Sequence, residues 1–154
     1  MPAGPQAPGM TLQLSLDRAD GDALAYVEQL LARNDLPSDV RTAPARFYVA
    51  RDGDRRVGVG GIQRQGDAAL LRSVVVEQSA RGEGVGTALC DALEARTAGA
   101  GIERLYLLTT TAAGFFADRG YGRVERAAVP DAVRGTAEFA ELCPDSATVM
   151  TKPL

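Results

Sequence analysis

Several residue types are absent or scarce, and each absence narrows the chemistry. The chain of 154 residues has no histidine and no tryptophan, one lysine at position 152, and two cysteines, Cys90 and Cys143. Without histidine, Ser–His and Cys–His nucleophile schemes and histidine-based metal sites are excluded. The cysteines follow no metal or disulfide spacing, so we expect no metal and a reduced, cytoplasmic setting, with Cys90 acting as a small buried hydrophobe.

Long apolar runs and excess positive charge are also missing. No run approaches the roughly 20 apolar residues of a membrane span, and the start of the chain lacks a signal-peptide pattern. A net charge of −3 without a dense Lys/Arg cluster argues against a nucleic-acid partner. Residues 1–9 combine three prolines with two glycines, which indicates a disordered lead. Residues 10–154 have the length and composition of a single domain.

The most informative stretch runs from Ser73 to Leu93. Three valines at 74–76 are typical of a buried strand, and a glycine-rich turn follows at 81–86. Apolar residues then recur at helical spacing, so the order is strand, glycine loop and helix start. This order favours anion binding, because the first helical turn has unpaired N–H groups and glycine lets the backbone approach a phosphate.

Two common phosphate-binding motifs do not fit this loop. A P-loop needs a lysine after the glycines, and a dinucleotide fingerprint needs a third glycine where Leu89 stands. The remaining pattern is Arg81-x-x-Gly84-x-Gly86. It resembles the Q/R-x-x-G-x-G/A signature of the GNAT acyl-CoA-dependent N-acetyltransferases, which also lies between an apolar strand and a long helix.

A second segment, Thr111–Tyr121, resembles the GNAT pattern A-x-x-F-Y-x-x-x-G-F/Y. Here we expect a short helix that packs Phe115 and ends at Gly120. The resemblance implies an α+β GNAT fold. Its sheet would be mixed, mostly antiparallel and of six to seven strands, flanked by about four helices, with a splayed parallel pair in the middle that holds acetyl-CoA.

The rest of the chain supplies the other expected elements. Asp20 is a candidate N-cap for a helix, a second short helix is expected at 36–39, and Pro130 is suited to the first turn of another. Asp52-Gly53 and Gly66-Asp67 indicate two hairpins, and the strand–helix–strand order around 85–99 favours a parallel pair. The expected strands are 11–16, 46–51, 56–64, 68–76, 104–109 and 146–152.

The family resemblance also implies how acetyl-CoA would bind. The pantetheine arm would pair with the backbone of Val74 and Val76, and the Val75 N–H would polarise the thioester carbonyl as a catalytic group. The loop and the second motif would complete the cofactor site with Arg81, Gly82, Glu83, Gly84, Val85, Gly86, Thr87, Phe115 and Phe116.

Two catalytic positions depart from the family pattern. Phe116 stands where many members have a tyrosine that protonates the leaving thiolate, and a phenyl ring cannot donate a proton. Tyr106 and Tyr121 remain candidates by residue type, although packing in strands is the simpler role for both. Gln63 corresponds to a common glutamate base, which leaves Glu77 as a weak candidate for the base and ordered water as the alternative.

Acceptor recognition rests on residues near the end of the central strands. Arginine binds acidic groups bidentately, so Arg72 and Arg134 are candidates for holding the acidic group of an amino acid. The other expected acceptor residues are Ser73, Thr109 and Thr110. The segments LLTTTA and ELCPDSA resemble the small ArsN-type acetyltransferases of arsenic resistance, which implies a small zwitterionic amine such as arsinothricin, or glutamate.

The sequence therefore predicts an acetyl-CoA-dependent N-acetyltransferase that acts on a small zwitterionic amine by direct transfer. A peptide or protein N-acetyltransferase is one alternative. A non-catalytic acyl-CoA-binding sensor is another, in which Phe116 and Gln63 reflect lost catalysis. We expect no nucleic-acid or membrane partner, and a homodimer is compatible with the resemblance.

Overall fold

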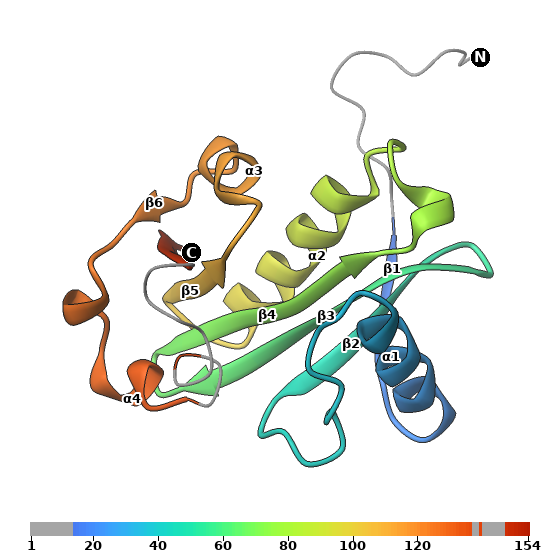
Figure 1. Cartoon of the computed structure of the whole chain (residues 1–154), viewed down its shortest axis with the longest axis horizontal. Coiled ribbons are helices and arrows are strands. Elements are labelled where there is room, and N and C mark those ends of the chain that lie inside the picture. Colours follow the sequence, from blue (N-terminus) through green and yellow to red (C-terminus); the bar gives the residue numbers. More distant parts are fainter. Residues whose placement is uncertain (1–13, 137–138, 140–146) are drawn as a thin grey trace.

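The computed structural model describes residues 14–136, 139 and 147–154. Its centre is a seven-stranded sheet in the order β1-β2-β3-β4-β5-β7-β6 (Figure 1). All neighbouring strands are antiparallel except β4 and β5, which are parallel. The strands are β1 (Ser15–Arg18), β2 (Arg46–Asp52), β3 (Arg55–Gln65), β4 (Ala68–Val76), β5 (Arg104–Thr109), β6 (Gly122–Arg123) and β7 (Thr148–Pro153).

Helices cover both faces of this sheet. The described α-helices are α1 (Asp22–Arg33), α2 (Val85–Gly99), α3 (Ala113–Asp118) and α4 (Asp131–Arg134), with short 3-10 helices at Gln78–Ala80 and Arg126–Ala128. The buried face of α1 packs on Phe47, Val49 and Val59, whereas α2 packs with α3 on the opposite face of the sheet. A third apolar cluster lies beneath α4 and joins β4, β5 and β7. The cofactor and acceptor elements predicted from the sequence thus surround one central strand, β4.

Most predicted elements are present where the local pattern was strong. The strands predicted at 68–76 and 104–109 match β4 and β5. Both hairpins form with left-handed glycines at their turns, Gly53 and Gly66. The predicted parallel pairing of β4 with β5 is confirmed. Gly101 and Gly120, both with positive φ, follow the ends of α2 and α3 as helix-terminating glycines should.

Four local predictions are wrong or shifted. No helix forms at 36–39, which have no regular secondary structure and lie between turns at 34–35 and 40–42. The N-cap of α1 is Gly21, and Asp20 contributes only its carbonyl, which accepts a hydrogen bond from the Ala23 N–H. The first strand begins at Ser15, later than expected, and residues 11–13 lie outside the described residues.

The fourth difference concerns α3. Phe116 is the buried aromatic of this helix, and Phe115, expected to pack, is 38 % exposed. Predictions for residues 1–9, for Cys143 and for the ELCPDSA segment lie outside the described residues. Cys90 is buried and free, as expected, and burial raises the pKa of its thiol to about 11. In the described part of the chain, none of the helices combines the length and apolarity needed to cross a bilayer.

Candidate functional site

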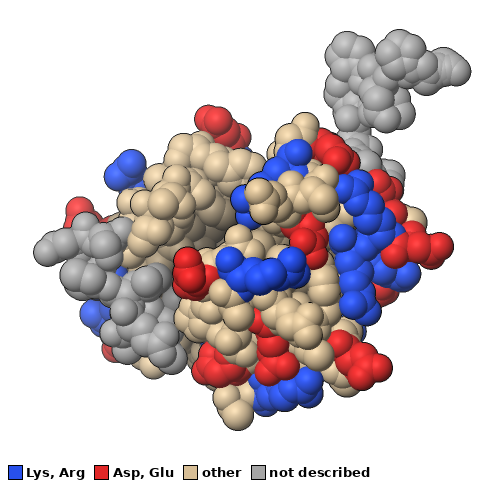
Figure 2. All heavy atoms as spheres, turned by 45° about the vertical axis from the view of Figure 1, so that its right-hand side comes forward, with Lys and Arg blue, Asp and Glu red and all other residues tan. Residues whose placement is uncertain are grey.

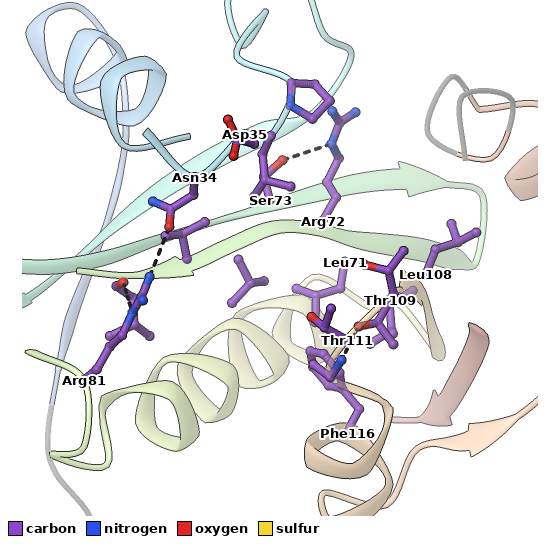
Figure 3. A pocket seen from close by; sticks show the side chains of 18 residues that line it. Asn34, Asp35, Leu71, Arg72, Ser73, Arg81, Leu108, Thr109, Thr111 and Phe116 are labelled. Carbon is purple, nitrogen blue, oxygen red and sulfur yellow. Dashed lines mark hydrogen bonds between the residues drawn. The ribbon is translucent and has the colours of Figure 1, made fainter. Parts of the chain in front are cut away.

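A cleft opens where β4 and β5 separate. These strands pair only from Ala68–Leu70 and Arg104–Tyr106, and both then continue for several residues without a ladder between them. The resulting cleft has a volume of about 570 Å³ (Figure 3). In the face shown in Figure 2, a hollow with walls that are neither acidic nor basic lies beside a surface of intermixed charges. The cleft is lined by Asn34, Asp35, Leu36, Pro37, Leu71, Arg72, Ser73, Val74, Val75, Val76, Arg81, Leu107, Leu108, Thr109, Thr110, Thr111, Ala112 and Phe116.

A β-bulge at Ser73 shapes the β4 side of this cleft. Val59 lies opposite Val75 and Gly61 opposite Arg72, so β4 has one residue more than β3 over this interval. Ser73 takes up the extra length in the left-handed region, with φ 58°. Such a conformation is uncommon for a residue with a side chain, and bulges re-aim the side chains beside active sites. Ser73 and Arg72 both line the cleft as predicted.

The peptide groups of β4 point alternately toward β3 and toward the cleft. The Glu77 N–H donates to the Val57 carbonyl of β3, and the Val75 carbonyl lies 2.7 Å from the point where a Cβ on Gly58 would stand. The peptide groups of residue 75 therefore face β3, and by alternation those of Val74 and Val76 face the opening. The prediction that Val75 supplies the oxyanion N–H is thus corrected. Val74 lies between Val75 and the bulge at Ser73 and lines the cleft.

The glycine loop presents backbone donors at the end of β4. Gly82 and Gly84 have φ of 84° and 81°, which glycine adopts without a Cβ penalty. The first hydrogen bond of α2 runs from the Ala88 N–H to the Gly84 carbonyl. The N–H groups of Val85, Gly86 and Thr87 consequently have no acceptor within the helix and carry the positive end of its dipole. This end of the site can hold a phosphate group.

The side chain of Arg81 bonds to protein groups instead of extending over the glycine loop. Its Nε donates to the Val76 carbonyl at 3.2 Å and its Nη2 to Asn34 Oδ1 at 3.1 Å (Figure 3). Arg81 thereby joins the end of β4 to the end of α1 and occupies one of the carbonyls predicted to pair with pantetheine. Glu83 accepts a hydrogen bond from Arg55 at 3.3 Å, which ties the loop to the β2–β3 hairpin.

The two phenylalanines of α3 have different environments. Phe116 lines the cleft and makes edge contacts with Phe115 and Tyr121, at centroid distances of 5.1 and 5.4 Å. Phe115 lies over the start of α2, with its Cζ 3.7 Å from the point where a Cβ on Gly86 would stand. The exposed Phe115 ring therefore lies beside the glycine loop. The assignment of Phe115 and Phe116 to the cofactor site stays a prediction.

The two tyrosines considered as proton donors face away from the cleft lining. Tyr121 is buried and donates to Glu94 Oε2 at 3.0 Å, and burial followed by the Glu94 charge raises its pKa. Glu94 is also paired with Lys152 and Arg119, so Tyr121 belongs to a polar group between α2, α3 and β7. Tyr106 is buried in the cluster beneath α4. Both tyrosines pack, as the simpler interpretation predicted.

At the other end of the cleft, Arg72 is held by buried neighbours. It is 7 % exposed, its guanidinium lies 5.9 Å from the Phe47 ring centroid, and its Nη1 donates to Gln63 Oε1 at 3.3 Å. Its Nε is 3.4 Å from the hydroxyl of Ser73. Gln63 itself is 3 % exposed, so this glutamine, which cannot act as a base, serves to orient the arginine.

The loop after α1 was missed by sequence reasoning and forms a wall of the cleft. Residues 34–37 all line it, and Asp35 provides the one carboxylate among the described lining residues. Asp35 has φ 58°, and Figure 3 shows it on the same side of β4 as Arg72 and Ser73. The Asn-Asp-Leu-Pro pattern indicates a turn, but nothing local in it shows that the turn folds back over β4.

Two of the predicted catalytic and substrate residues, Glu77 and Arg134, lie outside the lining, as do the predicted cofactor residues at 82–87 and 115. Glu77 accepts a 2.6 Å hydrogen bond from the Tyr26 hydroxyl and lies 3.6 Å from Arg33, so its carboxylate is engaged behind the end of β4. Burial and this hydrogen bond raise the pKa of Tyr26. Arg134 is on α4, paired with Asp131. Thr109 and Thr110 do line the cleft, and Thr109 Oγ1 accepts a hydrogen bond from the Ala112 N–H.

No cluster of three or more His, Cys, Asp or Glu side chains with metal-binding geometry occurs among residues 14–136, 139 and 147–154. The described cleft lining offers backbone groups, hydroxyls, the Asn34 amide, the guanidinium groups of Arg72 and Arg81, and the carboxylate of Asp35.

A splayed parallel strand pair beside a glycine-rich helix start defines the class of acyl-CoA transferases with a mixed central sheet. Consistent with this, the sequence profile of the acetyltransferase (GNAT) domain matches residues 43–123, more than half of the chain. The chain therefore belongs to the GNAT acetyltransferase family. No curated protein sequence matches it.

Solved structures share the fold at low sequence identity. N-acetylglutamate synthase from Neisseria gonorrhoeae, solved with coenzyme A and L-arginine, has a TM-score of 0.75 and 17 % identity over 92 % of this chain. The match covers 33 % of the synthase, so the present chain spans about a third of its length.

Two other similar structures are matched over nearly their whole length. A Mycobacterium tuberculosis protein solved with CoA and a ligand named NLQ has a TM-score of 0.69 and 23 % identity, covering 91 % of this chain and 99 % of its own. A ribosomal-protein alanine N-acetyltransferase from Escherichia coli has a TM-score of 0.68 and 15 % identity, covering 92 % and 94 %. These likenesses support the GNAT fold without specifying an acceptor.

Proposed function

We propose that this enzyme transfers the acetyl group of acetyl-CoA to the amino group of a small zwitterionic molecule, such as an amino acid or an amino-acid antibiotic. The observation that carries the proposal is the acceptor end of the cleft. It combines the buried cation of Arg72 with the carboxylate of Asp35 (Figure 3). A zwitterionic acceptor carries the complementary pair of charges, an acidic group for the arginine and an ammonium for the aspartate.

Acetyl-CoA, the acetyl donor of this family, would extend along the open edge of β4. Its phosphates suit the N–H groups at the start of α2, and the peptide groups of Val74 and Val76 suit the amide-containing arm. Binding at Val76 would require the Arg81 side chain to release the carbonyl to which it now donates. The Val74 N–H is then the candidate donor to the thioester oxygen, in place of Val75.

Direct transfer needs a short sequence of bond changes. The acceptor ammonium first loses one proton to a base, which frees the nitrogen lone pair. The nitrogen then forms a bond to the carbonyl carbon, the carbon–sulfur bond breaks, and the nitrogen loses a second proton while the thiolate gains one, so that one proton in total is released. Asp35 is the carboxylate in position to bind the ammonium and receive its proton, directly or through water. No described tyrosine lines the cleft. Water is our candidate to protonate the thiolate, whose ordinary pKa near 8.5 makes it a tolerable leaving group.

The acidic group of the acceptor decides the substrate class. A guanidinium binds carboxylate, phosphinate and arsinate oxygens in the same bidentate manner. Glutamate and arsinothricin are therefore the acceptors to test first, and the resemblance of LLTTTA to ArsN-type enzymes supports the second. The similar structures include an N-acetylglutamate synthase and a ribosomal-protein alanine N-acetyltransferase. We therefore compare an amino acid with a peptide as the acceptor.

Turnover with a panel of amines tests the proposal. Thiol release from acetyl-CoA would be measured with glutamate, phosphinothricin, arsinothricin and an alanine-starting peptide. Replacing Arg72 by Gln should lower kcat/KM for the carboxylate or phosphinate acceptor by about 10- to 100-fold, the effect of losing a charge-assisted hydrogen-bond pair. The Kd for CoA should stay within about twofold. Arg41→Gln, which removes an exposed arginine paired with Glu28, is the matched control.

Three outcomes would contradict this function. CoA binding without turnover of any amine would favour the acyl-CoA sensor. Turnover of the peptide alone would favour peptide N-acetylation. Equal turnover of amines with and without an acidic group, together with an unaffected Arg72→Gln variant, would remove the arginine from acceptor recognition.

A further inference from the structure

Four arginines converge on a second pocket that shares no residue with the cleft. This four-arginine pocket has a volume of about 310 Å³ and contains Arg18, Arg46, Arg64 and Arg96. Its remaining lining consists of Pro44, Tyr48, Ile62, Thr97, Ala100 and Ile102. The floor of the pocket is well packed, because Tyr48, Ile62 and Ile102 belong to the core on the α2 side of the sheet and are at most 8 % exposed.

The pocket forms where strand ends meet the C-terminal end of α2. Arg46 begins β2, Arg64 is next to the end of β3, and Arg18 ends β1. Arg96 lies in the last turns of α2 with its guanidinium 5.1 Å from the Tyr48 ring centroid. Successive arginines of this group are 28, 18 and 32 residues apart in the chain. The sheet brings them together, so no sequence motif indicates the pocket.

None of the four guanidinium groups has a carboxylate within salt-bridge distance among the described residues. Arg96 donates to the Leu16 carbonyl at 2.7 Å, and Arg64 donates to the carbonyls of Gly66 and Ala100 at 3.1 and 3.2 Å. A guanidinium has five N–H donors, so both retain donors for a ligand. The chain as a whole is acidic, at −3, and would be at −7 without these four charges.

Stabilisation of the helix end explains only two of the four arginines, Arg64 and Arg96. Cations near the C-terminus of a helix offset its dipole, and Arg64 and Arg96 do so at α2. The side chains of Arg18 and Arg46 make no hydrogen bond or ion pair with described residues and are exposed, yet they line the same pocket. Like charges gathered without partners repel one another, and an anion would relieve that repulsion.

We propose that the four-arginine pocket binds a small multivalent oxyanion, one carrying at least two phosphate or carboxylate groups. Arginine forks bind such groups bidentately, and a pocket near 300 Å³ is at the lower end of small-ligand sites. Because the pocket is separate from the cleft, an anion bound there is a ligand additional to acetyl-CoA and the acceptor. The proposal for this pocket therefore does not depend on which acceptor the cleft binds.

The test is calorimetric titration of the full chain with inorganic pyrophosphate and, separately, citrate, each with and without saturating CoA. Saturation with CoA fills the proposed cofactor site, so the remaining heat reports anion binding either at Arg72 in the cleft or at the four-arginine pocket, and the variants below distinguish the two. The test variant is Arg18→Gln/Arg46→Gln, which removes two charges without breaking a contact to a described residue. The charge-matched control is Arg41→Gln/Arg123→Gln, with both arginines outside the pocket.

The proposal expects one pyrophosphate or citrate to bind to the CoA-saturated wild type. Its Kd should rise roughly tenfold or more in Arg18→Gln/Arg46→Gln and change less than about twofold in the control pair. Preference for pyrophosphate or citrate would tell whether the natural ligand is a phosphate or a carboxylate. No binding to the wild type, equal loss in both double variants, or full binding by Arg18→Gln/Arg46→Gln would each overturn the proposal.

Discussion

The two ends proposed for the site, one for the cofactor and one for the acceptor, are built in different ways. The proposed cofactor end continues from the cleft into a loop made of backbone, with left-handed Gly82 and Gly84 and the N–H groups that begin α2. The proposed acceptor end is made of side chains from separate elements. Arg72 comes from β4, Gln63 from β3, and Asp35 from the loop after α1.

This difference explains why one end is general and the other selective. A loop of backbone donors binds the phosphates of a shared cofactor and needs only a few glycines at fixed spacing. An acceptor site needs particular charges at particular places, and each can change without disturbing the loop. Mutations should therefore separate the two ends, with CoA affinity responding at one and acceptor specificity at the other.

Of the substitutions below, Gly84→Val should have the largest effect, and this effect should be on the affinity for CoA. Position 84 has φ 81°, where a β-branched residue is strained although no atom lies within 4 Å of the added Cβ. Relief of the strain would turn the backbone donors away from the phosphates, so the Kd for CoA should rise on the order of a hundredfold, equivalent to losing two charge-assisted hydrogen bonds. Calorimetry with CoA measures this change.

Gly84→Asn is the matched control, because asparagine populates the left-handed region more readily than other residues with side chains. It should keep most of the affinity. If the valine and asparagine variants bound CoA equally well, the conformation of Gly84 would not be what shapes the cofactor end.

Asp35→Asn should have a smaller effect of the opposite kind, on the acceptor and not on CoA. Asparagine tolerates the φ of 58° at this position, so the loop should persist while the carboxylate is lost. We expect kcat/KM for the amino-acid acceptor to fall by about tenfold, with CoA affinity unchanged. Initial rates of thiol release at several acceptor concentrations give the value. A parallel loss of CoA binding would show that the two ends are not independent.

The smallest effect is expected from Gly86→Ala, at the cofactor end itself. An added Cβ would meet Phe115 at 3.7 Å and Val76 at 3.9 Å, which are ordinary contact distances, and Gly86 has no positive φ. The Kd for CoA should therefore change by less than about threefold. A large loss in this variant would mean that the cofactor passes closer to residue 86 than the space beside Phe115 allows.

The sequence predicted the cofactor end because its signal is contiguous. Strand, glycines and helix follow one another within 73–93, and local conformational preferences decide each of them. Within the same stretch, however, the sequence could not reveal the bulge. Ser73 adopts a left-handed conformation without being glycine, and the sequence gives no sign that the peptide groups of Val75 face β3.

The acceptor end was predicted in part. Arg72, Ser73, Thr109 and Thr110 line the cleft as expected, since they end strands whose pairing was evident from the pattern. Arg134 and Glu77 do not line it, because their positions depend on how α4 and the segment after β4 pack. Asp35 was missed for the same reason: a turn after a helix has no periodicity to show which surface it covers.

The sequence by itself determined the family, the central strands and the glycine loop that begins α2, because glycine conformations and apolar periodicity act over a few residues. Tertiary structure alone decided which side chains share a site. It turned Gln63 into the partner of Arg72, engaged Glu77 with Tyr26, and gathered four arginines around Tyr48. Those contacts join residues distant in the chain, and their geometry is set by sheet register and helix packing, which no local pattern encodes.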